Sequence, residues 1–112
     1  MDERQAAVCR RVGAEFQASP PELKLGLALG SIGKQPINGL RHRSEGDTSG
    51  WYIWSGEELS SDPEFFQPLH VEHVAELLPR VVPYLGLAPG WRFLLADGYE
   101  DVWFDASLLD MS

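Results

Sequence analysis

The chain has 112 residues, of which 44% are hydrophobic and 23% are charged, and its formal net charge at pH 7 is −8. This length and composition are typical of one globular domain over 1–112, and they exclude a disordered chain or a disulfide framework, because Cys9 is the single cysteine. The acidic balance disfavours nucleic acid and anionic membranes as partners, since like charges repel.

Charge is distributed unevenly along the chain. Residues 44–112 contain thirteen acidic and two basic side chains, a net charge of −11, whereas residues 1–43 have a net charge of +3. The acidic part favours a basic protein partner, although the same excess of negative charge also keeps a domain soluble. The first residues do not resemble a secretory signal and no apolar run approaches about 18 residues, so we expect a cytoplasmic protein without a membrane span.

The first two predicted elements are a helix and a strand. Val8, Val12 and Phe16 recur at every fourth position and predict an apolar stripe on a helix over 3–18. Two prolines end this helix, and the leucines that follow at alternate positions predict a strand over 24–29.

The next two predicted strands cover 37–43 and 51–55. The first contains Asn38 and Gly39, which suggest a bulge or a break. The second holds two tryptophans, a tyrosine and an isoleucine in succession, the densest block of strand-forming aromatic residues in the chain.

Side-chain alternation divides this aromatic strand between two faces of the predicted sheet. Trp51 and Ile53 point to one side, and Tyr52 and Trp54 point to the other. Because a tryptophan buries roughly 150–250 Å² of surface, most tryptophans belong to the core. We therefore assign Trp51 and Ile53 to the core and expect a partner to bind on the opposite face.

A helical pattern follows over 70–85. Valines and leucines recur at intervals of three and four residues, but Pro79 and Pro83 interrupt them. Proline lacks a backbone donor and disfavours a helical residue before it. We therefore expect a helix to about Leu78 and then a short turn that ends at Gly86.

The last two predicted strands, 91–96 and 99–105, form a hairpin around Asp97 and Gly98, a dipeptide typical of two-residue turns. The predicted pairs are Ala96 with Tyr99, Leu94 with Asp101 and Arg92 with Trp103 on one side, and Leu95 with Glu100, Phe93 with Val102 and Trp91 with Phe104 on the core side. The complete prediction is an α+β domain with about five strands in a mostly antiparallel sheet, an N-terminal helix and a proline-interrupted helix at about 70–85.

The pattern of potential ligands and nucleophiles disfavours a metal site and covalent catalysis. His70, His73 and Glu76 are spaced three apart on the predicted helix, with Glu72 beside them. This set drifts around the helix and has no cysteine cluster to complete it, so we predict a solvated polar face and no metal or cofactor. Cys9 lies on the predicted buried stripe and is therefore a poor nucleophile.

Carboxylates beside the aromatic strands could act as general acids only in a shared apolar pocket, which raises a carboxyl pKa. The candidates are Glu57, Glu58, Asp101 and Asp105, but solvated acids at strand ends are commoner. We predict no enzyme activity. The alternative is a small-ligand-binding or enzymatic domain with a carboxylate-lined aromatic cleft.

The favoured site is a protein-binding surface that combines aromatic and acidic side chains. Tryptophan and tyrosine ringed by charge are common at the centres of protein interfaces. The predicted surface consists of Tyr52, Trp54, Glu57, Glu58, Asp101 and Trp103. A scaffold subunit that oligomerises through the same patch is a third interpretation.

A family resemblance supports the binding interpretation. Asp47-Thr48-Ser49-Gly50-Trp51 leading into Gly56-Glu57-Glu58, with Leu85–Trp91 and Trp103 downstream, resembles the bacterial immunity-protein-33-like family over about 24–109. The chain reads as a divergent member, because the family more often has Asp-Ser-Gly-Trp without the threonine. The resemblance implies a mixed sheet with helices, and an antidote that neutralises a polymorphic toxin by binding it, without catalysis.

Overall fold

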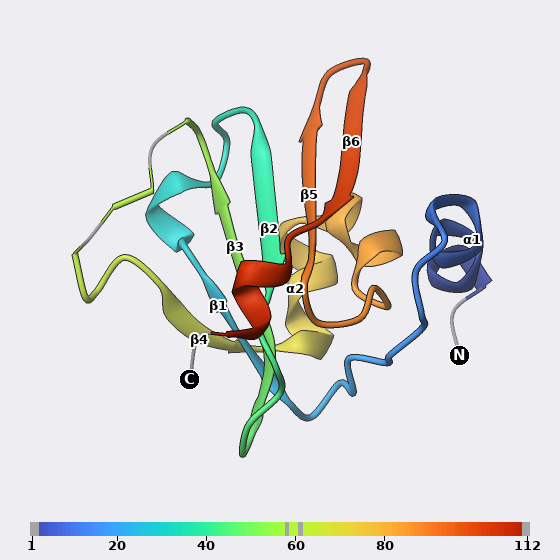
Figure 1. Cartoon of the computed structure of the whole chain (residues 1–112). Coiled ribbons are helices and arrows are strands. Elements are labelled where there is room, and N and C mark those ends of the chain that lie inside the picture. The colour runs from blue at the N-terminus through green and yellow to red at the C-terminus, as the bar shows by residue number, and fades with distance from the viewer. Residues whose placement is uncertain (1–2, 58, 61, 111–112) are drawn as a thin grey trace.

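The computed structural model describes residues 3–57, 59–60 and 62–110. Its centre is a mixed sheet of six strands in the order β4-β1-β3-β2-β5-β6 (Figure 1). β1 and β3 are parallel, and the other neighbouring strands are antiparallel. In chain order the elements are α1 (Glu3–Val12), β1 (Lys24–Leu27), η1 (Leu29–Ser31), β2 (Ile37–Arg41), β3 (Thr48–Ser55), β4 (Gln67–His70), α2 (Val71–Leu77), η2 (Pro79–Tyr84), β5 (Trp91–Ala96), β6 (Tyr99–Phe104) and η3 (Ala106–Leu109).

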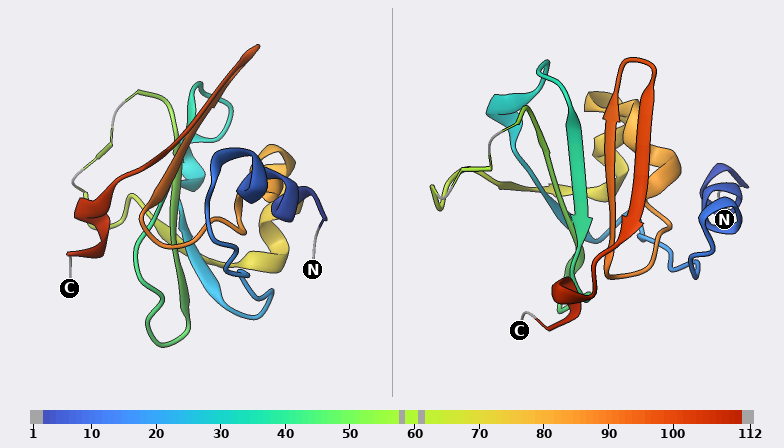
Figure 2. Two further views of the ribbon diagram at one scale, coloured as in Figure 1. Left: turned by 45° about the vertical axis from the view of Figure 1, so that its right-hand side comes forward. Right: turned by 45° about the horizontal axis from the view of Figure 1, so that its top comes forward.

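Helices cover one face of this sheet far more than the other. Figure 2 shows α1, α2 and η2 on one side and η3 on the opposite side. The main core lies under the first group and includes Trp51, Ile53 and Phe93, each at most 1% exposed. The predicted α+β class and the predicted core positions of Trp51 and Ile53 are confirmed. Among the described helices, none has the length and apolar character needed to cross a bilayer.

α1 is shorter than the predicted helix over 3–18. It ends at Val12 because Gly13 has a φ of +76°, a left-handed conformation common just after helices. Val8 and Cys9 are buried, as the apolar stripe predicts. Phe16 instead lies beyond the helix and forms an isolated bridge with Leu87, so this segment runs beside the chain that connects η2 to β5.

β2 has no bulge or break at Asn38 and Gly39. Its residues pair in continuous register with β3 and with β5, and the strand ends at Arg41 rather than at 43. Glycine is needed because the ring of Phe93 lies against the backbone: a Cβ at position 39 would be 2.2 Å from Cε2 of that ring. The dipeptide therefore marks a close approach between a ring and a strand.

The sheet has one strand that the sequence does not predict. β4 pairs antiparallel with β1 and contains Pro68, a residue that argues against a strand except at a sheet edge. α2 therefore begins at Val71, and it ends at Leu77, two residues before Pro79 starts η2. The predicted proline break is confirmed.

The β5–β6 hairpin has the predicted register in all six pairs, from Trp91 with Phe104 to Ala96 with Tyr99. Gly98 has a φ of +70°, which suits a turn glycine. The confirmed register places the odd-numbered residues of β6 on the sheet face away from α2.

Arg41 is a buried cation that joins distant parts of the chain. It is 0% exposed, and burial lowers its pKa to about 10, so it remains charged at neutral pH. Its guanidinium donates five hydrogen bonds of 2.7–3.4 Å, to the carbonyls of Gln17, Ala18, Ser49, Leu85 and Leu87. No described carboxylate pairs with it. Carbonyl dipoles therefore compensate the charge, and they tie β2 to three other segments.

A second polar network joins α1, η2 and β6. Arg11 donates two hydrogen bonds to the Glu100 carboxylate, at 2.6 and 3.0 Å, and the Tyr84 hydroxyl donates a short one to the same group. The Arg11 bond and then the Tyr84 bond lower the pKa of Glu100. Burial and then Glu100 raise the pKa of Tyr84 to about 12. The predicted core face of β6 therefore includes the Glu100 carboxylate, which accepts hydrogen bonds from side chains of α1 and η2.

Because of this carboxylate, the fold is expected to be less stable at low pH than at neutral pH. Because its pKa is lower in the folded state, Glu100 stabilises the fold above its unfolded pKa of about 4.3, and this contribution is lost as pH falls through the folded pKa. We expect Glu100→Gln to lower the free energy of unfolding at pH 7 by at most about 1 kcal/mol, since solvent screens the pair, and we expect the loss to be smaller at pH 3. Urea unfolding at both pH values checks this, and an equal loss at both would contradict it.

Candidate interaction surface

Four of the six predicted surface residues lie on the sheet face that α2 and η2 do not cover. Two rows of paired residues cross β3, β2, β5 and β6 in that order: Trp54, Asn38, Leu94 and Asp101 in one row, and Tyr52, Leu40, Arg92 and Trp103 in the next. Directly paired residues point to the same side of a sheet. The fold therefore brings residues from positions 52 to 103 onto one face.

Trp54 lies on this face, but its side chain is not accessible. It is 4% exposed and packs with Leu40 and Leu108 in a second, smaller core, with Phe65 and Phe66 against it. The chain before β4 and η3 together cover the indole. The prediction that Trp54 contacts a partner directly therefore needs correction, since the residue supports the surface from beneath.

Tyr52 is the accessible aromatic of β3, with 36% of its surface exposed. Its ring meets His42 edge to face at a centroid distance of 5.6 Å, and Phe66 at 5.2 Å. His42 is fixed in turn, because its Nδ1 lies 3.1 Å from the Leu108 carbonyl. A carbonyl only accepts, so Nδ1 carries the proton. Neighbours on both sides therefore hold the Tyr52 ring.

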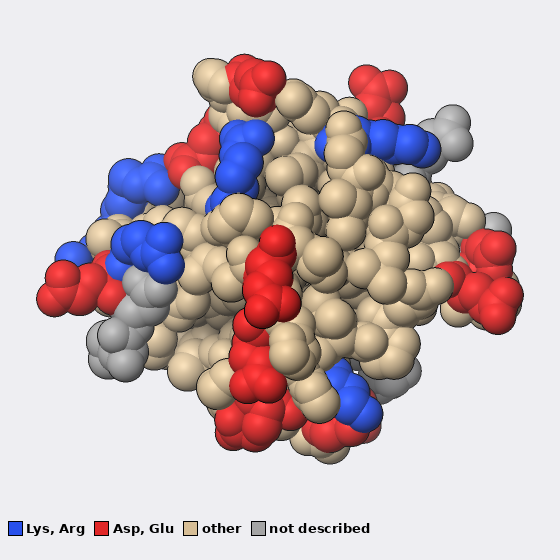
Figure 3. Space-filling model, turned by 180° about the vertical axis from the view of Figure 1, so that it is seen from behind, with Lys and Arg blue, Asp and Glu red and all other residues tan. Residues whose placement is uncertain are grey.

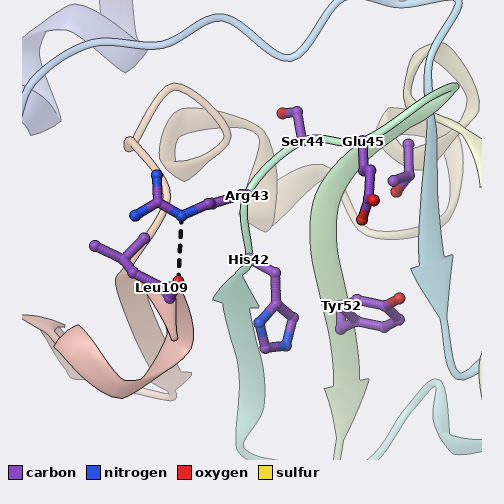
Figure 4. Close-up of a pocket in the computed structure, with 7 residues that line it drawn as sticks. His42, Arg43, Ser44, Glu45, Tyr52 and Leu109 are labelled. Atoms are coloured by element: carbon purple, nitrogen blue, oxygen red, sulfur yellow. Dashed lines mark hydrogen bonds between the residues drawn. The ribbon is translucent and has the colours of Figure 1, made fainter. Parts of the chain in front are cut away.

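Two shallow hollows meet at Tyr52 and His42. The larger, of about 570 Å³, lies between the β2–β3 hairpin and η3, where Arg43 Nε donates to the Leu109 carbonyl at 3.2 Å (Figure 4). Its described lining is His42, Arg43, Ser44, Glu45, Thr48, Tyr52 and Leu109. The smaller, of about 230 Å³, is apolar and is lined by Leu40, His42, Tyr52, Trp54, Leu59 and Phe66.

These hollows do not form the carboxylate-lined cleft that the alternative requires. Of the described residues, Glu45 is the only acid in the larger hollow, and the smaller one has none. The apolar hollow is also smaller than the roughly 300–1,000 Å³ of typical ligand pockets. Two converging carboxylates, which an acid–base mechanism needs, are not brought together here.

The outer strands β5 and β6 carry the rest of this face. Arg92 lies over the Trp103 ring at 5.3 Å and reaches Asp105 Oδ2 at 3.4 Å, rather than Asp101. Asp101 is exposed. We define the aromatic face by its exposed or half-buried side chains, which are Tyr52, Arg92, Leu94, Tyr99, Asp101 and Trp103.

The remaining predicted acids stand apart from the aromatic face. Glu57 is exposed just beyond β3, where it lines a separate hollow with Lys34 and Ser55. Glu58 lies outside the described residues. Negative charge also occurs on the opposite face: Figure 3 shows acidic side chains in a line over α2 and basic ones over α1. The aromatic rings, more than the charge, therefore distinguish the predicted surface.

One group of described residues could reach a common metal ion. Its members are His70, Glu72 and His73, all exposed, with ligand atoms within 4.8 Å of one another. Glu76 does not belong to the group, because His70 precedes α2 with an extended backbone and the helical spacing of three begins only after it. Cys9 is 3% exposed and burial raises its pKa, which disfavours the reactive thiolate.

Several residues of the hollows have no local signal in the sequence. His42, one residue after β2, contacts the Leu108 carbonyl in η3, and Leu59 lines the smaller hollow from a segment without regular structure. Such contacts depend on how distant segments pack. Only the alternation in β3 and the hairpin register could be used to place part of this surface in advance.

Comparison with known proteins identifies the family. The family model described as the Imm33-like domain matches residues 4–105, which includes nearly all of α1 and most of the region 24–109 that resembles the family. No curated protein and no solved structure matches the chain. Since the match covers far more than half of the sequence, the chain belongs to the Imm33-like domain family.

Proposed function

We propose that this chain is a non-catalytic immunity protein that binds and neutralises a protein toxin in the cytoplasm through the aromatic face. The observation that carries the proposal is the gathering of Tyr52, Tyr99 and Trp103 on a sheet face that α1, α2 and η2 leave uncovered. Tyr52 is 36% exposed and Tyr99 is 55% exposed. Rings of this kind are enriched at the energetic centres of protein interfaces.

Charge favours a basic toxin surface. The chain has a net charge of −8, and Asp101 lies exposed between Tyr99 and Trp103 along β6. An acidic binder attracts a basic partner over several ångströms and speeds its association at low salt. The family assignment supports the same function, since Imm33-like denotes resemblance to an immunity protein.

Single substitutions on the aromatic face are expected to weaken toxin binding. The protein is co-expressed with the toxin domain encoded beside its gene, and the affinity is measured by titration calorimetry. We expect Trp103→Ala to raise Kd about 30-fold and Tyr52→Ala about 10-fold, the range for interface residues that cost about 1.4–2 kcal/mol.

The matched control is Leu77→Ala. Leu77 is an apolar side chain with 42% exposure on α2, on the opposite side of the sheet, and its removal is expected to leave Kd unchanged. Circular dichroism verifies that each variant is folded. The proposal fails if no toxin binds at micromolar concentration, or if Leu77→Ala weakens binding while the two aromatic substitutions do not.

A further inference from the structure

β6 is an exposed sheet edge with a regular backbone. Only β5 pairs with it among the described strands, and that pairing contains no register shift from Tyr99 to Phe104. Figure 1 shows the hairpin projecting beyond the rest of the sheet. Tyr99 is 55% exposed and Phe104 is 48% exposed, so apolar surface lies at both ends of the strand. An edge of this kind is a template for another strand.

The backbone groups that face outward can be identified from one hydrogen bond. In an antiparallel pair, successive residues bond alternately to the neighbour and away from it. Asp105 N–H donates to the Gly90 carbonyl at 2.7 Å, so the odd-numbered residues of β6 bond toward β5. The N–H and carbonyl groups of Glu100, Val102 and Phe104 therefore point outward from the sheet.

The opposite edge of the sheet is protected, and β6 is not. β4 has four residues and contains Pro68, which lacks a backbone donor. Short edge strands and edge prolines are common devices against pairing with other chains. β6 has six residues and contains neither proline nor lysine.

We propose that the toxin contributes an extended segment that pairs with β6 as a seventh strand. This inference rests on the proposed function and specifies how the partner is recognised. Asp101 is exposed and has no described ion-pair partner, whereas Arg11 already neutralises Glu100. The added strand therefore carries an apolar side chain beside Val102 and a lysine or arginine on the opposite face, beside Asp101.

Charge favours a basic toxin segment over a second copy of the chain as the strand that pairs with β6. Each copy has a net charge of −8, and pairing two β6 strands would place Glu100 and Asp101 of both copies at one interface. Pairing two such edges concentrates like charges, which is unfavourable between neighbouring strands. A basic extended segment has no such penalty.

The test uses a substitution that removes one outward donor. Val102→Pro deletes the N–H at position 102 without deleting a bond to β5, and proline is tolerated where an edge N–H faces solvent. Val102→Thr is the matched control, because it keeps both the donor and the branched side chain. Thermal unfolding shows whether each variant is folded, and light scattering on the wild-type protein reports self-association.

The probes are the toxin domain encoded beside the gene and two synthetic peptides of eight residues, one alternating valine with lysine and the other valine with glutamate. We expect wild type and Val102→Thr to bind the toxin and the lysine peptide, and Val102→Pro to bind both at least 10-fold more weakly. We expect the glutamate peptide not to bind. Amide exchange at Glu100, Val102 and Phe104 is expected to slow at least 10-fold in the complexes.

The outcomes distinguish this inference from the proposed function. If wild type and folded Val102→Pro bind the toxin equally, strand pairing is wrong while the immunity function stands. If no toxin binds but the lysine peptide protects the three amides, the proposed function fails while the basic-strand preference of the edge is upheld. Equal binding of the two peptides, no binding of the lysine peptide, or a wild-type dimer lost in Val102→Pro would each overturn the inference.

Discussion

Replacing Arg41 with methionine is expected to lower the free energy of unfolding by about 3–5 kcal/mol, the range for breaking a buried charged network. The substitution keeps much of the side-chain volume but removes all five donated hydrogen bonds. The carbonyls that they satisfy lie in the segment after α1, in β3 and in the η2–β5 connection. Buried acceptors left without donors cost stability even where the cavity is filled.

Urea unfolding measures this effect, and Arg43→Met is the matched control. Arg43 is exposed and donates one hydrogen bond, to the Leu109 carbonyl, so we expect its loss to change the free energy of unfolding by less than about 0.5 kcal/mol. Arg41→Lys is expected to remain destabilised, because an ammonium cannot reproduce the planar set of donors. A loss below about 1 kcal/mol in Arg41→Met would show that these bonds are not important for stability.

Gly39→Ala is expected to destabilise the fold by about 2–3 kcal/mol through overpacking. The added methyl group would lie 2.2 Å from the Phe93 ring. That ring is 1% exposed and packs between Trp51, at a centroid distance of 5.5 Å, and Tyr84, at 5.1 Å. It therefore cannot move without displacing other core side chains.

Gly30→Ala is the control for the effect of glycine on the unfolded chain. A Cβ at position 30 has no neighbour within 4 Å, so the change in stability is expected to stay within about 0.5 kcal/mol. Phe93→Leu in the Gly39→Ala background is expected to recover part of the loss, since it removes the clashing ring atoms. Equal stability of Gly39→Ala and wild type in chemical denaturation would contradict the packing described for β2.

Strong local signals allowed much of the fold to be predicted. Asp97 and Gly98 determine a tight hairpin, and a tight hairpin determines the register of β5 and β6. Pro79 ends α2 because proline has no backbone N–H to donate. The alternation of Trp51 and Ile53 places both side chains in the core. Each of these features depends on residues close together in the chain.

The features that could not be predicted depend on distant residues. The end of α1 is the exception, because Gly13 is a local signal that ends the helix, whereas the position of Phe16 depends on its bridge to distant Leu87. Pro68 prevents the prediction of β4 from sequence, because proline is compatible with a strand only at the edge of a sheet, and the edge is not known in advance. Arginine is usually an exposed residue in a strand, and the burial of Arg41 depends on carbonyls that three other segments supply.

In the candidate surface, too, the features set by local signals could be predicted and those set by distant contacts could not. Alternation placed Tyr52 and Trp54 on one face, and the hairpin register placed Asp101 and Trp103 on a common side. The sequence has no indication that Phe66 and Leu108 would cover Trp54. Which part of a sheet face stays open depends on the packing of irregular segments, for which no periodic pattern exists.

Residue-resolved hydrogen exchange, measured on the complex with the toxin domain encoded beside the gene, tests most directly whether the aromatic face binds the partner. We expect toxin binding to slow exchange in β6 and around Tyr52 and to leave exchange in α1 and α2 unchanged. Slowed exchange confined to α1, α2 and η2, with β6 unaffected, would contradict this expectation.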